Sequence, residues 1–404
     1  MAPDTEALRR EFPALDLPVH GRRLAYLDSA STSLKPRAVI DAVVQVFTHQ
    51  AGNVHRGVHA LSEAATEAFD AARADIARFL GGRSDEVVLT SGTTAAINLV
   101  AHSWARGHIG PGDVVIATAL EHHSNLVPWQ VLCAERGATL RIAPIDDRGR
   151  IDLAAFAALL EPRVKLVAVS QLSNVAGTIA PIAEIAALAH AVGAVVLVDG
   201  AQAVAHLAVD VGQLGCDFYA FSGHKLLAPT GTGVLWARRA LLAAMPAWQT
   251  GGEMVAAVDY DRARLREPPH RFEAGTPNIA GVIGLGAAIR FLQALDRPAL
   301  ARHEARLHAR LRDELTALPG VRVLGHPEAA VVAFTLAGVH PHDLATIVDR
   351  DGVAIRSGHH CAEPLHHRLG VDASARASLA LYNDDADIDA LVASVARAGK
   401  VMRS

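Results

Sequence analysis

The sequence contains few cysteines. Only Cys133, Cys216 and Cys361 occur in 404 residues, and no two of them form a Cys-x-x-Cys pair. Three scattered thiols exclude the disulfide framework that stabilises many small secreted proteins. We therefore expect the chain to work in a reducing, cytoplasmic environment.

The sequence also lacks an excess of charge of one sign. Its 38 Lys and Arg stand against 42 Asp and Glu, which gives a formal net charge of -4. A nucleic-acid-binding protein usually carries a clear basic excess. We therefore expect no nucleic-acid partner.

Long hydrophobic runs are missing as well. The most apolar stretch, residues 185–198, has 14 residues and contains His190, whereas a membrane span needs about 20. The first six residues contain no apolar region of the kind that a signal peptide requires. We therefore expect no membrane association, and we interpret residues 185–198 as a helix followed by a buried strand.

Hydrophobic residues are nevertheless abundant. They make up 51% of the chain against 20% charged residues, which predicts a globular protein with a large core. From about residue 85, short β-branched runs alternate with alanine-rich segments, a pattern typical of βαβ units. The predicted strands are residues 87–90, 114–117, 139–143, 166–170, 195–199, 218–222 and 233–236.

This pattern predicts an α/β fold with a mostly parallel seven-stranded sheet and helices on both faces. We assign the sheet to a large domain of residues 26–289, and residues 1–25 and 290–404 to a smaller α+β domain. No Gly/Ser linker separates them, so we expect rigid packing. The later elements that we predict are helices at 280–295, 302–318, 343–350 and from 385, and strands at 321–324 and 330–336.

Lys225 provides the strongest local signal for chemistry. It lies in the Ser222-Gly223-His224-Lys225 loop directly after an apolar strand, and ligands of open α/β sheets bind beyond the carboxyl ends of strands. A partly buried lysine has a lowered pKa and can form a Schiff base with a carbonyl cofactor. The alternative is a solvated loop lysine.

Asp199 and the turn at residues 90–94 add to this signal. Asp199 ends an apolar strand and could keep a pyridine nitrogen protonated, although it could also cap the next turn. Thr93 and Thr94 open a helix after a strand, which suits either a phosphate site or a simple N-cap. A phosphate-bearing pyridine aldehyde accounts for the three segments together.

Two histidine-rich segments complete the candidate site. In Glu121-His122-His123, one imidazole could stack on a planar ring and move protons, or both could be surface residues. Cys361 ends the segment Arg356-Ser357-Gly358-His359-His360-Cys361, where nearby positive charge favours a reactive thiolate. An inert buried cysteine is the alternative, and three adjacent residues converge too poorly for a zinc site.

The sequence resembles the SufS-type (group II) cysteine desulfurases, a branch of the fold-type I, class V aminotransferase-like enzymes that use pyridoxal 5′-phosphate. The resemblance covers nearly the whole chain. Its motifs are residues 25–30, 55–59, 121–123, 173–175, 198–202, 222–225, 272–278, 356–361 and 376–378.

The resemblance implies a role for each residue around the cofactor. Lys225 would hold pyridoxal 5′-phosphate in a Schiff base and act as the catalytic base, Asp199 would pair with the pyridine nitrogen, and Gln202 would contact the phenolic oxygen. His122 would stack on the ring and take part in catalysis. The phosphate would be held by Thr93, Thr94, Ser222 and His224, with Thr276 reaching it from the other subunit of a homodimer.

The resemblance also implies a substrate, a product and a partner. Ala30, His55, Asn174, Arg356 and Arg376 would bind L-cysteine, and Cys361 would receive its sulfur as a persulfide while alanine is released. A SufE-like or SufU-like acceptor protein would then carry the sulfur toward iron–sulfur cluster assembly. The alternatives are a selenocysteine lyase, another class V lyase or aminotransferase, and a pyridoxal phosphate-binding regulator or scaffold without turnover.

Four positions depart from the pattern of the family that the sequence resembles. Ser91 stands where an arginine is common, Ala95 stands where a glutamate is common, and Glu363 and His366 stand where apolar residues are common. We expect Ala95 to change the entrance to the active site. We expect Glu363 and His366 to change the surface beside the thiol, and with it the choice of acceptor.

Overall fold

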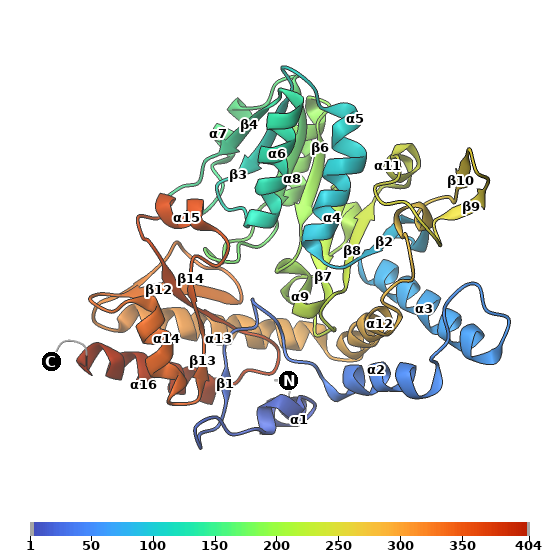
Figure 1. Ribbon diagram of the computed structural model, residues 1–404. Helices are drawn as coiled ribbons and strands as arrows, with labels where there is room; N and C mark the ends of the chain where they lie inside the picture. The colour runs from blue at the N-terminus through green and yellow to red at the C-terminus, as the bar shows by residue number, and fades with distance from the viewer. Residues whose placement is uncertain (1–3, 402–404) are drawn as a thin grey trace.

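The computed structural model describes residues 4–401. Residues 1–3 and 402–404, which belong to the predicted small domain, lie outside the described residues. A larger region is built on a seven-stranded sheet, and a smaller region, coloured orange to red in Figure 1, is built on a four-stranded sheet.

The seven-stranded sheet has the strand order β2-β8-β7-β6-β5-β3-β4. Only β8 runs antiparallel to its neighbours, so the predicted mostly parallel sheet is confirmed. All seven predicted strands are present with almost the predicted ends. They are β2 (Val87–Thr90), β3 (Val114–Thr118), β4 (Thr139–Ala143), β5 (Val164–Ser170), β6 (Val195–Asp199), β7 (Phe218–Ser222) and β8 (Gly233–Ala237).

Helices cover both faces of this sheet. Successive side chains of a strand point to opposite faces, so neighbouring residues of one strand pack in different apolar clusters. In β6, Val196 and Val198 belong to one apolar cluster and Leu197 to another. The first cluster includes α2 (Arg37–His49), α3 (Ala60–Phe79), α7 (Leu153–Ala158), α8 (Ile182–Ala191) and α12 (Ile279–Gln293). The second includes α4 (Thr93–Leu99), the π-helical turn η3 (Val100–Ala105), α6 (Val127–Arg136) and α11 (Arg239–Ala244).

The smaller region contains an antiparallel sheet of order β11-β12-β15-β14 packed on helices. The short strand β1 (Ala25–Tyr26) pairs in parallel with β13 (Val353–Ala354), so an early segment of the chain joins this region. The sheet strands are β11 (Val321–Val323), β12 (Val331–Leu336), β14 (Arg356–Gly358) and β15 (Ser374–Ser378), and the helices are α13 (Arg297–Ala317), α14 (Pro341–Asp349) and α16 (Asp385–Val401).

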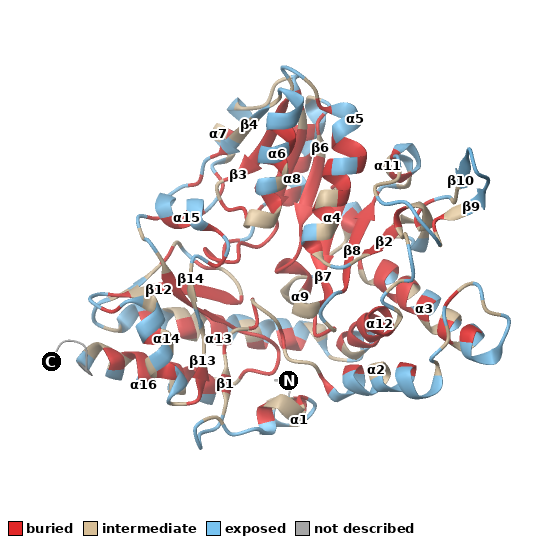
Figure 2. Cartoon of the chain, in the orientation of Figure 1, coloured by how far each residue is buried: buried red, intermediate tan, exposed pale blue. Residues whose placement is uncertain are grey.

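Figure 2 shows the buried residues concentrated in the central sheet and in α12. The remaining elements are short. They are α1 (Thr5–Arg10), η1 (Pro13–Asp16), η2 (Ser84–Glu86), α5 (Arg106–His108), η4 (His123–Asn125), α9 (Ala203–His206), α10 (Val211–Leu214), η5 (Gly223–Lys225), β9 (Val255–Val258), β10 (Ala263–Leu265), η6 (His270–Phe272) and α15 (Glu363–Arg368).

Helix α13 begins five residues before the predicted start at residue 302. Pro298 lies in its first turn, where the missing N–H of proline costs no helical hydrogen bond. The Asp296 carboxylate accepts a hydrogen bond from the N–H of Ala299 at 3.0 Å and so caps the helix. Proline and aspartate together therefore mark the start of this helix rather than a break.

The two regions share apolar contacts across the predicted domain boundaries. Leu27 packs in the core of the smaller region, whereas Leu300, Leu365 and Tyr382 belong to the main cluster of the larger region. The core of the smaller region therefore extends past the predicted boundary at residue 26, and the core of the larger region extends past the predicted boundary at residue 290.

Among residues 4–401, no single helix is both long and apolar enough to cross a membrane. Helices α12 and α13 meet those criteria only as a pair, and they are bent by 87° relative to each other.

Candidate active site

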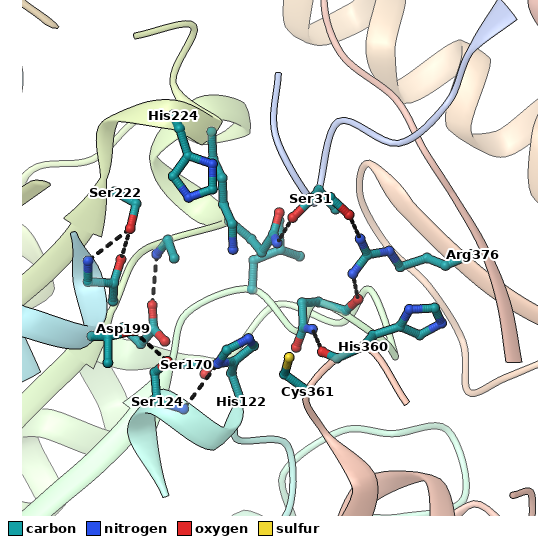
Figure 3. Close-up of a pocket in the computed structure, with 18 of the residues that line it drawn as sticks. Ser31, His122, Ser124, Ser170, Asp199, Ser222, His224, His360, Cys361 and Arg376 are labelled. Atoms are coloured by element: carbon teal, nitrogen blue, oxygen red, sulfur yellow. Dashed lines mark hydrogen bonds between the residues drawn. The ribbon is translucent and has the colours of Figure 1, made fainter. Parts of the chain in front are cut away.

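Lys225 and Asp199 meet at the carboxyl edge of the large sheet. Asp199 ends β6, and Lys225 ends the η5 turn that follows the neighbouring strand β7. The strand β8 runs antiparallel to β7, so the chain turns back immediately and keeps η5 at this edge. Both residues line a cavity of about 210 Å³. Figure 3 shows Asp199 among the residues that surround this cavity.

Burial sets the protonation of these two groups. It lowers the pKa of Lys225 to about 8, against the opposing effect of Asp199. It also raises the pKa of Asp199, whose Oδ1 atom accepts a hydrogen bond from the N–H of Ala201 at 2.9 Å. The Lys225 amine makes no hydrogen bond to another described residue, so it faces the cavity free to react.

His122 presents a neutral imidazole to the same cavity. Its Nδ1 atom accepts a hydrogen bond from the N–H of Ser124 at 3.1 Å, so its proton lies on Nε2. Burial lowers the pKa of His122 to about 3, with a further contribution from Lys225. The ring can therefore cover a planar ligand without adding charge.

Glu121 anchors the turn that carries His122. It is buried, and it accepts hydrogen bonds from Asn125 Nδ2 and Ser170 Oγ, each at 2.6 Å. Burial still raises the pKa of Glu121 to about 7. We did not predict a role for Glu121, although it belongs to the motif that contains His122.

A cluster of hydroxyl groups closes one end of the cavity. The N–H of Thr93 donates to Ser222 Oγ at 2.8 Å, and the hydroxyls of Thr94 and Ser124 lie 2.7 Å apart. A Cβ atom on Gly233 would approach the Cα atom of Gly92 to 2.3 Å, so only glycine allows β8 to come this close. These donors can hold an anionic group such as a phosphate.

Arg376, on β15 of the smaller region, forms the opposite wall together with Asn174, which lies after β5 of the larger region. Arg376 donates from Nη1 to the carbonyl oxygen of Asn174 at 3.2 Å and from Nη2 to Ser31 Oγ at 2.8 Å. Burial lowers the pKa of Arg376 to about 10, which leaves it charged at neutral pH. It pairs loosely with the Asp28 carboxylate, whose Oδ1 atom lies 3.4 Å from Nη2, and it also lines the cavity, where it can bind the carboxylate of a ligand.

Cys361 is exposed, and it lies in an unusual backbone conformation. Both His360 and Cys361 have positive φ, at 51° and 56°, which costs energy for residues with side chains. Two hydrogen bonds from the larger region hold the turn: Asn174 Nδ2 donates to the carbonyl oxygen of His360, and the N–H of His123 donates to that of Cys361, each at 2.7 Å. The two adjacent histidines therefore have different roles: the side chain of His122 faces the cavity, whereas the N–H of His123 holds the turn that carries Cys361.

The cavity brings together most of the predicted site residues but excludes two. His55 lies outside it, 3.1 Å from the carboxylate of Asp70, and Thr276 lies in an exposed loop before α12. The predicted residues that line the cavity are Ala30, Thr93, Thr94, His122, Asn174, Asp199, Gln202, Ser222, His224, Lys225, Arg356, Cys361 and Arg376.

Several lining residues were not among the predicted site residues. Ser31, Ser124 and His360 adjoin residues that we had selected, so their neighbours in the sequence could have indicated them. Ser170 ends β5, which is the kind of position where we expected ligands. Leu172 and Ala201 carry no polar side chain that could have marked them.

The predicted effect of His366 on the surface is wrong. His366 is fully buried (0% exposed) on α15, and its Nδ1 atom lies 3.0 Å from the carbonyl oxygen of Ala362. The helix turns this side chain inward, whereas Glu363 on the same helix is exposed. Among residues 4–401, no group of three or more His, Cys, Asp or Glu side chains could hold a metal ion.

The cavity fits pyridoxal 5′-phosphate in chemistry and in position. Gln202 donates from Nε2 to the carbonyl oxygen of Ala30 at 2.9 Å, but its buried Oε1 atom has no hydrogen-bond partner. The unpaired amine of Lys225 suits an aldehyde, the carboxylate of Asp199 suits a pyridinium, and the hydroxyl cluster suits a phosphate. The residues present can therefore hold each functional group of the cofactor.

The chain matches the model of the class-V aminotransferase family over residues 25–391. It is 46% identical over 403 residues to a probable cysteine desulfurase of Xylella fastidiosa (strain 9a5c), covering 99% of this chain and 97% of that protein. It is 49% identical over 401 residues to a cysteine desulfurase of Dickeya dadantii, covering 98% and 97%.

Two solved structures are similar along the whole chain. The cysteine desulfurase CsdA of Escherichia coli superimposes with a TM-score of 0.93 at 41% identity, covering 99% of this chain and 100% of that one. A cysteine desulfurase from Thermococcus onnurineus NA1 superimposes with a TM-score of 0.94 at 37% identity, covering 99% of each chain. The α/β fold predicted from the sequence is confirmed.

Proposed function

The chain belongs to the class-V aminotransferase family, and on that basis we propose that it is a pyridoxal 5′-phosphate-dependent cysteine desulfurase. It converts L-cysteine to L-alanine and transfers the sulfur to Cys361. The observation that carries this proposal is a single cavity that contains Lys225, the buried cation of Arg376 and the thiol of Cys361.

The side chains on the strand ends would hold the cofactor in this proposal. Lys225 would bind its aldehyde carbon, Asp199 would hold a proton at its ring nitrogen, and His122 would cover its ring. Thr93, Thr94, Ser222 and His224 would bind its phosphate. Bound pyridoxal 5′-phosphate supplies an electron sink conjugated to the substrate Cα atom.

The opposite wall binds and orients the substrate. Arg376 pairs with the substrate carboxylate, and Asn174, Arg356 and the backbone of Ala30 direct the amino acid toward the cofactor. Lys225 removes the proton from the substrate Cα atom. A lysine with its pKa lowered to about 8 is partly unprotonated near neutral pH, as a general base must be.

Cys361 takes the sulfur. Its thiolate forms a bond to the substrate sulfur as the carbon–sulfur bond breaks, and the electron pair of the broken bond stays with the three-carbon fragment. That fragment takes up protons and leaves as alanine. The enzyme thiol and cysteine thus become an enzyme persulfide and alanine, with atoms and electrons balanced.

The persulfide supplies sulfur for iron–sulfur cluster assembly. Both carbonyl groups of the His360-Cys361 turn are held by the larger region, so this turn has little freedom to carry sulfur away. We therefore propose that a SufE-like or SufU-like acceptor brings its own thiol to the enzyme, as for a SufS-type member of the family.

The quaternary structure and the compartment are further parts of this proposal. A homodimer would explain why Thr276, which is exposed in this chain, is part of the motif that the sequence shares with the family. In such a homodimer, His55, which lies outside the cavity of its own chain, would contribute to the active site of the partner subunit. The free thiols of Cys133, Cys216 and Cys361 support a reducing, cytoplasmic location.

One measurement tests the proposed function. The protein, loaded with pyridoxal 5′-phosphate, is incubated with L-cysteine with and without a thiol reductant, and alanine and sulfide are measured separately. We expect alanine in both cases, a one-sulfur adduct of about +32 Da on the Cys361 peptide, and much faster release of sulfide with the reductant than with L-cysteine as the only thiol. Production of pyruvate in place of alanine, or full-speed release of sulfide without any reductant, would contradict the proposal.

A further inference from the structure

The segment of residues 30–35 contacts both walls of the cavity. Ser31 Oγ accepts the hydrogen bond from Arg376 Nη2 at 2.8 Å, which Figure 3 shows. Two residues further along the same segment, Ser33 contacts the turn that carries Lys225. Ser33 is buried (2% exposed), and no step of the proposed reaction uses it.

The Ser33 hydroxyl bridges the backbone on either side of Lys225. Its Oγ atom donates to the carbonyl oxygen of His224 at 3.0 Å and accepts from the N–H of Leu227 at 2.8 Å. The single proton of the hydroxyl is used in the first contact, and a lone pair of the oxygen is used in the second. Ser33 therefore connects the residue before the lysine with the second residue after it.

The carbonyl oxygen of His224 accepts further hydrogen bonds from the 30–35 segment. The N–H of Ser33 donates to it at 3.0 Å, the Thr32 hydroxyl at 3.2 Å and the Lys35 amine at 3.1 Å. This carbonyl belongs to the peptide bond that joins His224 to Lys225. Because a peptide bond is planar, a fixed carbonyl also fixes the backbone nitrogen of Lys225.

The turn beyond Lys225 is strained. The register of β7 places only the start of this turn, because β7 ends at Ser222. Leu227 is buried (3% exposed) and has a positive φ of 62°, which costs energy for a residue with a side chain. Without the Ser33 hydroxyl, the N–H of Leu227 would also lose its acceptor, and an unpaired buried N–H is costly. The turn therefore depends on Ser33 for its conformation.

From these contacts we infer that Ser33 is a positioning residue for Lys225. It holds the turn in the conformation that presents the lysine amine to the cofactor and to the substrate Cα atom. Because Ser31 of the same segment contacts Arg376, the segment also relates the position of this base to the site of the substrate carboxylate. The inference rests on the proposed function, because it requires Lys225 to bind the cofactor and to remove the Cα proton.

The test compares Ser33→Ala with the matched variant Ser29→Ala. Ser29 precedes the same segment and is buried to a similar degree (4% exposed). Its hydroxyl lies 2.7 Å from Tyr382 Oη rather than against the lysine turn. Both variants lose one buried hydroxyl, but only Ser33→Ala loses the bridge across Lys225.

The first measurement isolates the step at the Cα atom. L-Alanine, the expected product, has the same carboxylate and Cα proton as L-cysteine but no sulfur, so Cys361 takes no part. NMR in heavy water follows exchange of this proton for deuterium, per mole of bound cofactor. We expect Ser33→Ala to lower the maximal exchange rate about 10- to 100-fold, because the base is displaced. The half-saturating L-alanine concentration should change by less than about 3-fold, because Arg376 still binds the carboxylate.

Binding of pyridoxal 5′-phosphate to the cofactor-free protein gives a second readout that needs no turnover. We expect its dissociation constant, measured by visible absorption, to rise about 10-fold in Ser33→Ala, because binding must then order a loosened turn. Ser29→Ala should stay within about 2-fold of the unaltered protein in both measurements.

Lys35→Met provides a second variant if Ser33→Ala does not fold. It keeps Ser33 and removes one of the donors to the carbonyl oxygen of His224. We expect the maximal exchange rate of L-alanine to fall about 3-fold, because the peptide before Lys225 is held less firmly.

An unchanged exchange rate or an unchanged dissociation constant in Ser33→Ala would overturn the inference. Equal changes in Ser33→Ala and Ser29→Ala would also do so, since they would indicate a general effect of losing a buried hydroxyl. If Ser33→Ala does not fold, an unchanged exchange rate in Lys35→Met would have the same meaning. Failure of the proposed function would be distinct, because the unaltered protein would then form no alanine from L-cysteine, whatever the effect of Ser33→Ala on cofactor binding.

Discussion

The two walls of the cavity hold their functional groups in different ways. On the wall formed by the larger region, Asp199 is the last residue of β6 and Lys225 ends the short turn after β7, so the register of the sheet fixes their positions. On the wall formed by the smaller region, Cys361 lies in a turn of two residues with positive φ. That turn keeps its place through hydrogen bonds from Asn174 and His123 of the other region.

The positions of the functional groups on the two walls therefore depend on different interactions. A strand end keeps its geometry as long as the core is intact, because many buried contacts support it. A strained turn keeps its geometry only while a few specific hydrogen bonds hold it. We therefore expect substitutions on the first wall to remove chemistry outright, and substitutions around the second to misplace a group that is still present.

The largest effect is expected for Lys225→Ala. It removes both the attachment point of the cofactor and the base at the substrate Cα atom, so turnover of L-cysteine should fall by at least about 10³-fold. Borohydride reduction followed by mass spectrometry should attach the cofactor to the Lys225 peptide of the unaltered protein and to no peptide of the variant. Lys35→Ala, which removes a nearby lysine that binds backbone carbonyls, is the control, and it should still be labelled at Lys225. Labelling of the variant at another lysine would contradict the assignment.

Cys361→Ala should abolish alanine formation from L-cysteine but leave measurable alanine formation from L-selenocysteine. The carbon–selenium bond is weaker and selenolate is the better leaving group, so its release depends less on a nucleophile. Alanine formed from each substrate is the measurement, with Cys133→Ala as the control for loss of an unrelated thiol. Equal loss with both substrates would show that the second wall is as indispensable as the first.

Asn174→Asp should have an intermediate effect. The change keeps the size of the side chain but removes the N–H group that donates to the carbonyl oxygen of His360. A displaced Cys361 should lower kcat for L-cysteine by about 10- to 100-fold. Because release of selenium depends less on Cys361, kcat for L-selenocysteine should fall less. A uniform loss with the two substrates would mean that Asn174 acts on the substrate alone.

Glu273→Gln should affect acid stability while leaving turnover near neutral pH within about 3-fold. Glu273 supports β2 behind the hydroxyl cluster, since it pairs with Arg73 at 2.7 Å and accepts from the N–H of Leu89 at 2.8 Å. Burial alone would raise the pKa of Glu273, but the charge of Arg73 outweighs burial and lowers this pKa from 4.5 to about 2. Because the pKa is lower in the folded protein, ionised Glu273 stabilises the fold at pH values above the unfolded-state pKa of 4.5. This contribution is lost as the pH falls from 4.5 toward 2.

Thermal unfolding across this pH range measures the effect. The variant should have a lower midpoint than the unaltered protein at neutral pH, and the difference should shrink as the pH falls. Glu267→Gln, at an exposed carboxylate near Arg271, should show almost no difference at either end. A constant difference for Glu273→Gln at every pH would contradict the assigned role of the ion pair.

The sequence was sufficient to predict the sheet and the wall that it forms. Apolar runs such as residues 195–199 end in a polar residue, and in a parallel sheet the ends of such runs must meet at one edge. The start of α13 was missed because Pro298 suggests a break unless the capping Asp296 is considered with it.

The second wall could be predicted only in part. The motif around Cys361 marked a reactive thiol, but nothing in the local sequence indicates that His360 and Cys361 have positive φ. Likewise, the burial of His366 depends on how α15 packs and on Ser374, which is eight residues further along the chain. Such contacts arise from tertiary packing, which local residue patterns do not encode.

The pairing of an early segment with a late one has a consequence for the order in which the protein assembles. The N–H of Ala30 donates to Ser378 Oγ across 348 residues, and Arg376 reaches Ser31 across 345, whereas Thr93 reaches Ser222 across only 129. Closing the longer loops adds little to the thermodynamic cost, since that cost grows only with the logarithm of length, but distant contacts slow folding. We therefore expect the cofactor side of the cavity to form before the substrate side during folding, so that a partly folded chain would recognise the cofactor before it recognises an amino acid.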